Sequence, residues 1–298
     1  MRGQRGKSET LSLMTLILAM SIFGTIGLLR KFIPLPSGTI AFFRGAIGTV
    51  TLLLVMLVMR KKPDFAAIRR NVWLLLASGV FLGFNWVLLF EACEYTTVAT
   101  ATLCYYMAPM IVVAVSPFLL RERMTLKRAL CVLVTLVGAV LVSGVLKDGD
   151  SDWRGILLGL GAALLYAAIV LSNKKLKGID AYDRTVVQLA VATVVMLVYT
   201  LLAERVSVEV FTPTVIVLLA VAGILHTGIA YALYFGSVGA LPAQTVAIFS
   251  YIDPAVAVLL SALVLREPIG ALEIVGAILI LGAAVIAEVE FGRHKKQS

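Results

Sequence analysis

The sequence predicts an all-α integral membrane protein with ten transmembrane helices, arranged as two inverted five-helix repeats around a central cavity. Three observations support this fold class: the composition, the length of the apolar runs, and an internal repeat. Of the 298 residues, 60% are hydrophobic and 14% are charged, and the mean hydropathy is +1.00. A soluble domain has about a quarter of its residues charged, so most of this chain must face lipid or other apolar helices.

The apolar residues fall into runs that are long enough to cross a bilayer as helices. A transmembrane helix needs roughly 20 apolar residues, whereas a barrel strand has about ten residues of alternating polarity. The runs in this chain are continuous, which favours helices. The ten expected spans are Leu11–Leu29, Gly38–Met59, Val72–Phe90, Val98–Leu120, Ala129–Leu146, Gly155–Ser172, Val186–Ala203, Thr214–Phe235, Ala243–Leu265 and Gly270–Ala287.

The net charge of +9 is distributed in the way that sets orientation in a membrane. Lys and Arg concentrate before the first span, after the last, and in alternate connections at residues 60–70, 121–128 and 174–184. Cytoplasmic connections carry such an excess, so we expect a multi-pass protein of the cell (inner) membrane whose N- and C-termini are cytoplasmic. Topology and anionic lipid then explain the basic runs, and we expect no nucleic-acid partner.

The second half of the chain repeats the first. With a shift of 145 residues, residues 73–123 lie over residues 218–268 without a gap, and the matches include Tyr106 with Tyr251 and Pro109 with Pro254. The run Leu120-Arg121-Glu122 also falls on Leu265-Arg266-Glu267, and a shift of about 143 places residues 21–31 over residues 164–174. Because each half holds five spans, an odd number, the second half must insert upside down, as in many secondary transporters. We expect residues 147–153 to form an extramembrane hinge loop between the halves.

Both halves end in a stretch that resembles a known family. Residues 118–126 followed by residues 136–141, and residues 263–268 followed by residues 274–282, are similar to the C-terminal ends of two EamA-type repeats of the drug/metabolite transporter (DMT) superfamily. The resemblance covers residues 11–287. It implies a ten-helix permease with one EamA-like five-helix repeat at residues 11–146, a second at residues 154–288, and export or exchange of small metabolites. The small multidrug-resistance branch is also similar, but it uses a buried Glu in its first helix, which Leu11–Leu29 lacks.

Three ionisable residues lie well inside expected spans, away from the span ends, where a charged side chain costs about 2.5–3.5 kcal/mol. The first is Arg44, in the second span. Its planar fork suits the carboxylate of an anionic or zwitterionic substrate. The alternative is a structural role, in which Arg44 pairs with Glu91 or Glu94 or extends toward the membrane surface.

The other two ionisable residues are Asp253 and His226. Asp253 is a candidate for proton coupling or for binding a substrate amine. Alternatively it pairs with Arg44 or caps a helix that restarts at Pro254, because proline suits the first turn of a helix. His226 is a candidate proton switch, and its alternative role is a neutral hydrogen bond between helices.

Pro109 and Pro254 occupy matching positions inside spans of the two halves. Each removes a helical hydrogen bond, and paired breaks of this kind point to a binding site near the membrane midplane. Nearby tyrosines either line the cavity or pack between helices with one hydrogen bond each. The nearby tyrosines are Tyr105, Tyr106 and Tyr251, and the remaining buried polar or amphipathic candidates, which alternatively only join helices, are Asn85, Trp86, Tyr166, Gln188 and Gln244.

These features favour a secondary transporter, an exporter or exchanger of small polar metabolites such as amino acids, that works by alternating access. The alternatives are a channel or an intramembrane enzyme, and the enzyme is disfavoured because the sequence has no HExxH or GxSxG motif. We expect no metal and no cofactor. The expected partners are a small-molecule substrate and membrane lipid, proton coupling is left open, and the chain is expected to be a monomer or a weak homo-oligomer.

Overall fold

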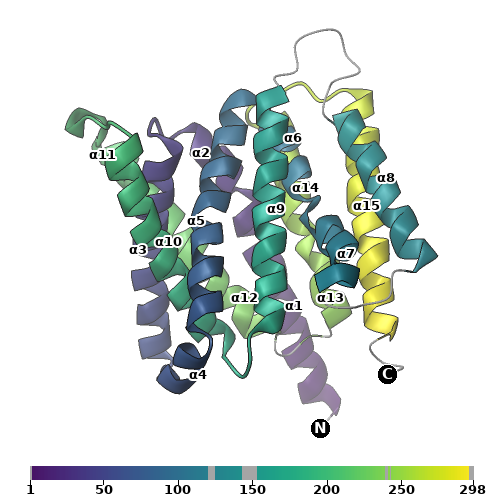
Figure 1. The fold of residues 1–298 in the computed structure, drawn as a ribbon, viewed down its shortest axis with the longest axis horizontal. Coiled ribbons are helices and arrows are strands. Elements are labelled where there is room, and N and C mark those ends of the chain that lie inside the picture. The colour runs from purple at the N-terminus through teal and green to yellow at the C-terminus, as the bar shows by residue number, and fades with distance from the viewer. Residues whose placement is uncertain (1, 120–124, 143–152, 239–240, 242, 295–298) are drawn as a thin grey trace.

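The computed structural model of the chain describes residues 2–119, 125–142, 153–238, 241 and 243–294. Within these ranges every regular element is a helix (Figure 1). In chain order the elements are α1 (Arg2–Gly24), α2 (Ile26–Lys31), α3 (Ser37–Val58), α4 (Phe65–Arg70), α5 (Val72–Tyr95), α6 (Val98–Tyr105), α7 (Ala108–Leu119), α8 (Leu126–Val142), α9 (Trp153–Lys175), α10 (Ala181–Ala203), the 3-10 turn η1 (Val208–Val210), α11 (Pro213–Gly223), the π-helical turn η2 (Ile224–Ile229), α12 (Ala230–Val238), α13 (Ala243–Ser250), α14 (Ile252–Leu263) and α15 (Ala271–His294).

Seven helical segments in these ranges are long and apolar enough to cross a membrane. They are Thr10–Lys31, Ser37–Val58, Val72–Tyr95, Val98–Val115, Trp153–Lys175, Ala181–Ala203 and Pro213–Ser237. Shorter apolar helices occupy Ala129–Val142, Ile248–Leu263 and Ala271–Ile286, where the sequence predicts the other spans. The prediction of a multi-pass helical membrane protein is therefore confirmed, and the count of ten spans stays a prediction. Of the expected hinge loop at residues 147–153, residues 147–152 lie outside the described residues, and Trp153 is the first residue of α9.

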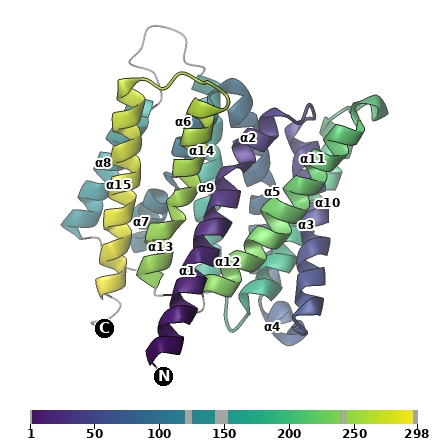
Figure 2. The same cartoon turned by 180° about the vertical axis from the view of Figure 1, so that it is seen from behind.

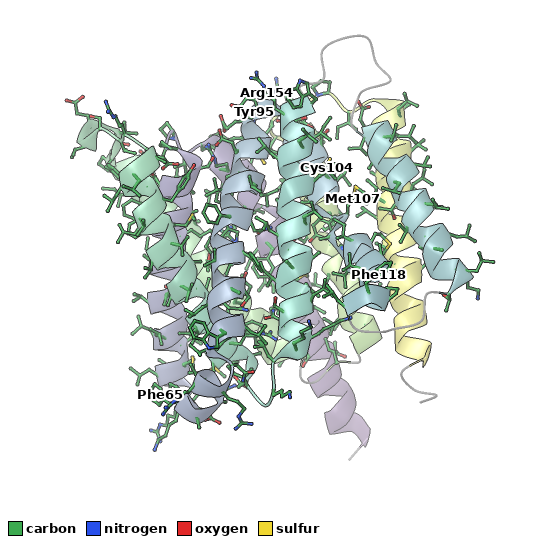
Figure 3. All side chains as sticks on the ribbon, in the orientation of Figure 1. Phe65, Tyr95, Cys104, Met107, Phe118 and Arg154 are labelled. Carbon is green, nitrogen blue, oxygen red and sulfur yellow. The ribbon has the colours of Figure 1, made fainter. Side chains whose placement is uncertain are left out.

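The helices run the length of the molecule between two ends. We call the end that carries Tyr95 and Arg154 the upper end, and the end that carries Phe65 the lower end (Figure 3). The chain of α1 begins at the lower end and α15 finishes there, whereas α9 begins at the upper end (Figure 1). Helices α1 and α9 therefore run in opposite directions (Figure 1).

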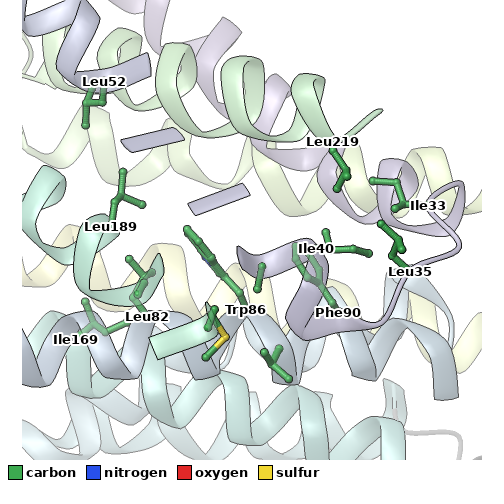
Figure 4. Close-up of a cluster of buried hydrophobic side chains, with 14 of the residues drawn as sticks. Ile33, Leu35, Ile40, Leu52, Leu82, Trp86, Phe90, Ile169, Leu189 and Leu219 are labelled. Atoms are coloured by element: carbon green, nitrogen blue, oxygen red, sulfur yellow. The ribbon is translucent and has the colours of Figure 1, made fainter. Parts of the chain in front are cut away.

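The helices of the two halves are interleaved (Figure 2). Helix α1 packs against α12, α13 and α14 of the second half, and α9 packs against α5, α6 and α7 of the first. Helix α3 packs against α10, and α8 packs against α15. A buried cluster that includes Ile40, Trp86, Phe90, Leu189 and Leu219 joins α3, α5, α10 and α11 (Figure 4).

Polar groups at the helix ends are paired where the chain turns. The Thr97 hydroxyl accepts a hydrogen bond from the backbone N–H of Thr100 at 3.0 Å and so caps α6. The carboxylate of Glu204, just after α10, accepts from the backbone N–H groups of Gly38 at 2.8 Å and Thr39 at 2.7 Å. Acidic groups stabilise helix N-termini in this way, so the end of α10 holds the start of α3.

Among the described residues, three spans are broken into two separate helices, and a fourth contains the π-helical turn η2. Helix α6 ends at Tyr105 and α7 begins at Ala108, while α13 ends at Ser250 and α14 begins at Ile252. Pro109 and Pro254 each lie in the first turn after the break, as proline favours, so the predicted interruptions are present. The third break, at Thr25 between α1 and α2, has no proline; its counterpart α9 is unbroken.

Gly79 of α5 packs closely against α10. A Cβ atom added there would lie 2.6 Å from Cβ of Val191 in α10 and 3.0 Å from the backbone oxygen of Gln188. We expect Gly79→Ala to reduce the free energy of unfolding by about 1–3 kcal/mol, the usual effect of overpacking. Thermal unfolding of the purified protein in detergent measures this change.

The matched control is Gly236→Ala in α12, because nothing lies within 4 Å of the added Cβ. This variant should unfold at the wild-type temperature or slightly above it, since alanine favours helix. Equal effects of the two substitutions would contradict the α5–α10 packing described above.

Candidate functional site

A cavity of about 570 Å³ lies between the interrupted helices. Its volume is in the usual range of small-molecule sites, roughly 300–1,000 Å³. Residues of α1, α2, α3, α5, α6, α7, α9, α12, α13 and α14 line it, so both halves contribute to the wall. Eight predicted site residues are in this lining: Arg44, Trp86, Tyr105, Tyr106, Pro109, Tyr166, Tyr251 and Asp253.

Aromatic rings form a continuous row along the wall. The ring centroids of Tyr166 and Tyr105 are 5.4 Å apart, those of Tyr105 and Tyr106 are 5.7 Å apart, and those of Tyr106 and Tyr251 are 6.2 Å apart. The row starts on α9, crosses the break between α6 and α7, and ends at the break before α14. Both proline-associated breaks therefore present tyrosine to the cavity.

Arg44 is buried in the wall, with 5% of its surface exposed. Its Nε donates to the Thr227 hydroxyl at 2.9 Å, and its guanidinium carbon lies 4.3 Å from the centroid of the Trp86 ring. Aromatic faces stabilise a cation at such distances. Because Nε is already bonded, the two Nη groups of the fork are the donors best placed for a ligand.

The acidic partners considered for Arg44 are engaged elsewhere. Glu91 accepts from the Ser37 hydroxyl at 2.7 Å, and Glu94 lies 3.2 Å from a guanidinium nitrogen of Arg30. Among the described residues, ion pairs form at Arg30, Lys31 and Lys61, and none forms at Arg44. The structural ion pair considered for Arg44 is therefore not found in the described part of the chain.

Asp253 lies on the opposite half, in the first turn of α14. Its Oδ2 accepts a hydrogen bond from the Tyr106 hydroxyl at 2.6 Å, which joins the two broken helices across the cavity. A carboxylate has two oxygens and about four acceptor positions, so Asp253 keeps acceptor capacity toward the cavity that it lines.

Four other predicted residues, Asn85, Gln188, His226 and Pro254, are outside the lining, and interhelical contacts use the polar groups of the first three. Asn85 donates to the backbone oxygen of Ala162 at 2.7 Å. The Gln188 amide nitrogen lies 2.7 Å from the Ser78 hydroxyl and 2.8 Å from Oδ1 of Asn173. The Gln244 side chain lies outside the described residues.

His226 forms a contact between helices, as in the alternative to a proton switch that the sequence offered. Its Nε2 lies 2.7 Å from the Thr25 hydroxyl, and its Nδ1 lies 3.2 Å from the backbone oxygen of Val221. A group of three or more His, Cys, Asp or Glu side chains able to hold a metal ion is not found among the described residues.

Several lining residues were not identified from the sequence. They include Tyr231, Tyr234, Cys93 and Lys174. The internal repeat held the signal for one of them: a shift of 145 residues places Trp86 over Tyr231, and both line the cavity. Lys174 is an exposed residue in the last turn of α9 and brings the cavity wall to the lower end of the molecule.

At the upper end the packing is closed. Lys31 lies 3.9 Å from a carboxylate oxygen of Glu267, whose other oxygen accepts from the backbone N–H of Val98 at 2.9 Å and from the Ser261 hydroxyl. Gly27 permits the close approach, because a Cβ there would lie 2.5 Å from Cγ1 of Val98. Helix α2 is thus held against α6 and the end of α14.

The sequence profile of the EamA-like transporter family matches residues 10–144 and 153–288. The chain belongs to this family. The EamA-family chain is 29% identical to an uncharacterized transporter, YxxF, of Bacillus subtilis (strain 168), over 86% of this chain and 83% of the relative. It is 30% identical to the pseudopaline exporter CntI of Pseudomonas aeruginosa (strain PAO1), over 54% of this chain and 55% of that protein.

A solved crystal structure has the same fold as this EamA-family protein. The match covers 94% of this chain and 98% of the other chain, with a TM-score of 0.65 at 20% sequence identity. Family membership makes the protein a multi-pass membrane transporter and implies a small-molecule substrate.

Removing the Tyr106 hydroxyl tests the contact across the cavity. Tyr106→Phe leaves a carboxylate oxygen of Asp253 without its 2.6 Å donor, and a buried polar group that loses its partner costs about 1–3 kcal/mol. We expect a lower unfolding temperature for this variant. Tyr95→Phe, at an exposed helix end, is the control and should unfold as the wild type does; an unchanged Tyr106→Phe protein would refute the structural importance of this bond.

Proposed function

We propose that this protein is a secondary transporter that moves small polar metabolites, such as amino acids, by alternating access. The observation that carries the proposal is the cavity that both Arg44, from the first half, and Asp253, from the second, line. A cationic fork suits a carboxylate and an anionic group suits an amine. A zwitterion between them would satisfy both charges inside the membrane.

The packing pattern supports the division into repeats at residues 11–146 and 154–288 that insert in opposite directions. The contact of α9 with α5 has a counterpart in the contact of α1 with α12, and α3–α10 and α8–α15 are contacts between corresponding helices. Each such pair is what a two-fold axis in the membrane plane would produce. Rocking of the halves about this axis would expose the cavity to each side in turn.

The distribution of basic residues and the end at which the cavity wall reaches the surface support a membrane orientation and a direction of transport. The lower end carries the basic connections and, by the charge bias, faces the cytoplasm. The exposed Lys174 brings the cavity wall to that end, whereas α2, α6 and Glu267 close the other. A cavity open to the cytoplasm suits an exporter or exchanger, and one relative carries the name of an exporter. We propose that a monomer suffices, because one chain supplies the whole wall.

Transport by purified protein in proteoliposomes tests the function. We expect saturable uptake of labelled amino acids that is stimulated by unlabelled substrate on the opposite side, because a carrier exchanges one molecule for another. We expect Arg44→Ala to reduce uptake at least about tenfold through loss of a charge-assisted hydrogen bond, and Arg44→Lys to restore little, since lysine lacks the planar fork.

The same vesicles separate the alternative functions. Conductance without saturation would indicate a channel, and chemical conversion of the labelled compound would indicate an enzyme. Uptake that is driven by an imposed pH gradient would indicate that transport is coupled to protons. If the Arg44→Ala variant takes up substrate at the wild-type rate, Arg44 is not part of the proposed site.

Membrane orientation is tested by labelling single cysteines in a background without native cysteine. Lys62→Cys and Lys177→Cys lie in connections expected to be cytoplasmic, and Ser207→Cys lies in the connection between α10 and α11; all three positions are exposed. In intact cells an impermeant maleimide should label position 207 and should spare positions 62 and 177 until the membrane is opened. Labelling of all three positions from outside would contradict the inverted arrangement.

A further inference from the structure

The π-helical turn η2 interrupts the long helix between α11 and α12. Two consecutive side chains of this turn bond to backbone oxygens five residues earlier: Nδ1 of His226 to Val221 at 3.2 Å, and the Thr227 hydroxyl to Ala222 at 3.1 Å. The matching residues of the first half, 79–84, lie in the regular helix α5. Wide turns of this kind occur frequently at functional sites, and this one is confined to the second half among the described helices.

Thr227 faces Arg44 on the neighbouring helix α3. Its hydroxyl is fully buried, accepts the 2.9 Å bond from Nε of Arg44, and donates to Ala222. A hydroxyl supplies one donor and two acceptor positions, so the bond to Ala222 fixes the acceptor direction toward Arg44. Thr227 thereby fixes how the guanidinium is presented to the cavity.

His226, the preceding residue, faces the break between α1 and α2. Because the backbone oxygen of Val221 only accepts, Nδ1 carries the hydrogen in that contact. The Thr25 hydroxyl lies 2.7 Å from Nε2 and 2.8 Å from the backbone oxygen of Ile22, so its single hydrogen serves only one of these two acceptors at a time. Thr25 is the residue at which α1 ends and α2 begins. The contact therefore holds the bend that lays α2 across the upper end of the cavity.

The turn and helix α3 are packed as one unit. Added Cβ atoms at Gly48 and Gly228 would lie 2.4 Å from Cγ2 of Thr227 and 2.3 Å from Cγ2 of Thr51. No space remains for the turn to slide independently of the segment that carries Arg44. A displacement of Arg44 must then move Thr227 and, with it, His226.

We propose that the π-helical turn η2 is a positioning element, in which Thr227 sets the orientation of Arg44 and His226 links that orientation to the bend at Thr25. Thr227 and His226 are thus positioning residues for a site whose use in binding substrate rests on the proposed function. Occupation of Arg44 on one side of the turn and opening of α2 on the other would be coupled through two side chains that are neighbours in sequence.

Cys93 is a native probe of this coupling that needs no substrate. It is 1% exposed and lines the cavity together with Ile26 and Gly27 of α2, so its reaction with N-ethylmaleimide requires the packing around it, which includes α2, to loosen. The background is Cys104→Ala with Cys131→Ala, which leaves Cys93 as the single cysteine of the three. The measured quantity is the rate of alkylation in proteoliposomes, read by mass spectrometry.

We expect Thr25→Val and His226→Leu each to raise this rate roughly threefold to tenfold, the effect of one lost hydrogen bond on an opening equilibrium. The effect of the double variant should be smaller than the product of the two single effects, since both changes remove the Thr25–His226 contact, while Thr25→Val also removes the bond to Ile22 and His226→Leu the bond to Val221. Thr227→Val should also raise the rate, and Thr227→Ser, which keeps the hydroxyl, should react as the background does. The matched control is Thr49→Val on α3, whose hydroxyl bonds within its own helix to Gly45.

The decisive comparison pairs Arg44 with Thr227. Arg44→Ala should change the alkylation rate of Cys93 in the background protein. It should have no further effect in the Thr227→Val variant, which already lacks the Arg44–Thr227 hydrogen bond. Additive effects of the two changes, or a Thr227→Val protein that behaves like Thr49→Val, would overturn the proposal. Because the readout involves neither transport nor ligand, a negative transport result would leave this inference standing, and additivity here would leave the proposed function standing.

Discussion

The structure depends on the requirement that a chain in lipid satisfies its own backbone polar groups. Regular helices meet this requirement along most of the fold. The exceptions are the breaks at Thr25, Tyr106 and Tyr251 and the π-helical turn, and each of them lies beside the cavity or contacts a residue that lines it. Irregular backbone is tolerated in such places because buried polar partners or water in a cavity replace the missing helical bonds. The position of the site and the positions of the breaks therefore have one cause.

The same requirement governs the buried charges. Arg44 has no carboxylate within ion-pair distance among the described residues; the Thr227 hydroxyl and the face of Trp86 stabilise it instead. Asp253 receives the Tyr106 hydroxyl. Each charge is thus held by a neutral partner on another helix, and the two charges stay separate. A ligand with opposite charges would complete the compensation that the protein leaves partial, which explains why a polar solute could enter an otherwise aromatic cavity.

Much of the architecture could be predicted from sequence because lipid makes long apolar runs unambiguous and because proline marks a break by its missing N–H. The paired prolines therefore located two helix breaks beside the cavity, and the repeat would have added Tyr231 through its match with Trp86. The break at Thr25 has no such marker in the residues around it, and the side chain that contacts Thr25, His226, is distant in sequence. Asn85 and Gln188 looked like site residues, yet helix–helix contacts use their amides. A single sequence cannot distinguish an amide that joins helices from one that faces a cavity, because tertiary contacts decide the difference.

The interleaving of the halves has a consequence for how the chain reaches its folded state. Helix α1 leaves the ribosome before the other described helices, but it packs against α12, α13 and α14, which begin only at Ala230, Ala243 and Ile252. The face of α1 that carries Gly24 packs against Val256 in the folded protein. During synthesis this face has no protein partner until most of the polypeptide has been made. Contacts this distant in sequence form slowly, so the nascent protein depends on temporary shelter by lipid or by the insertion machinery during translation.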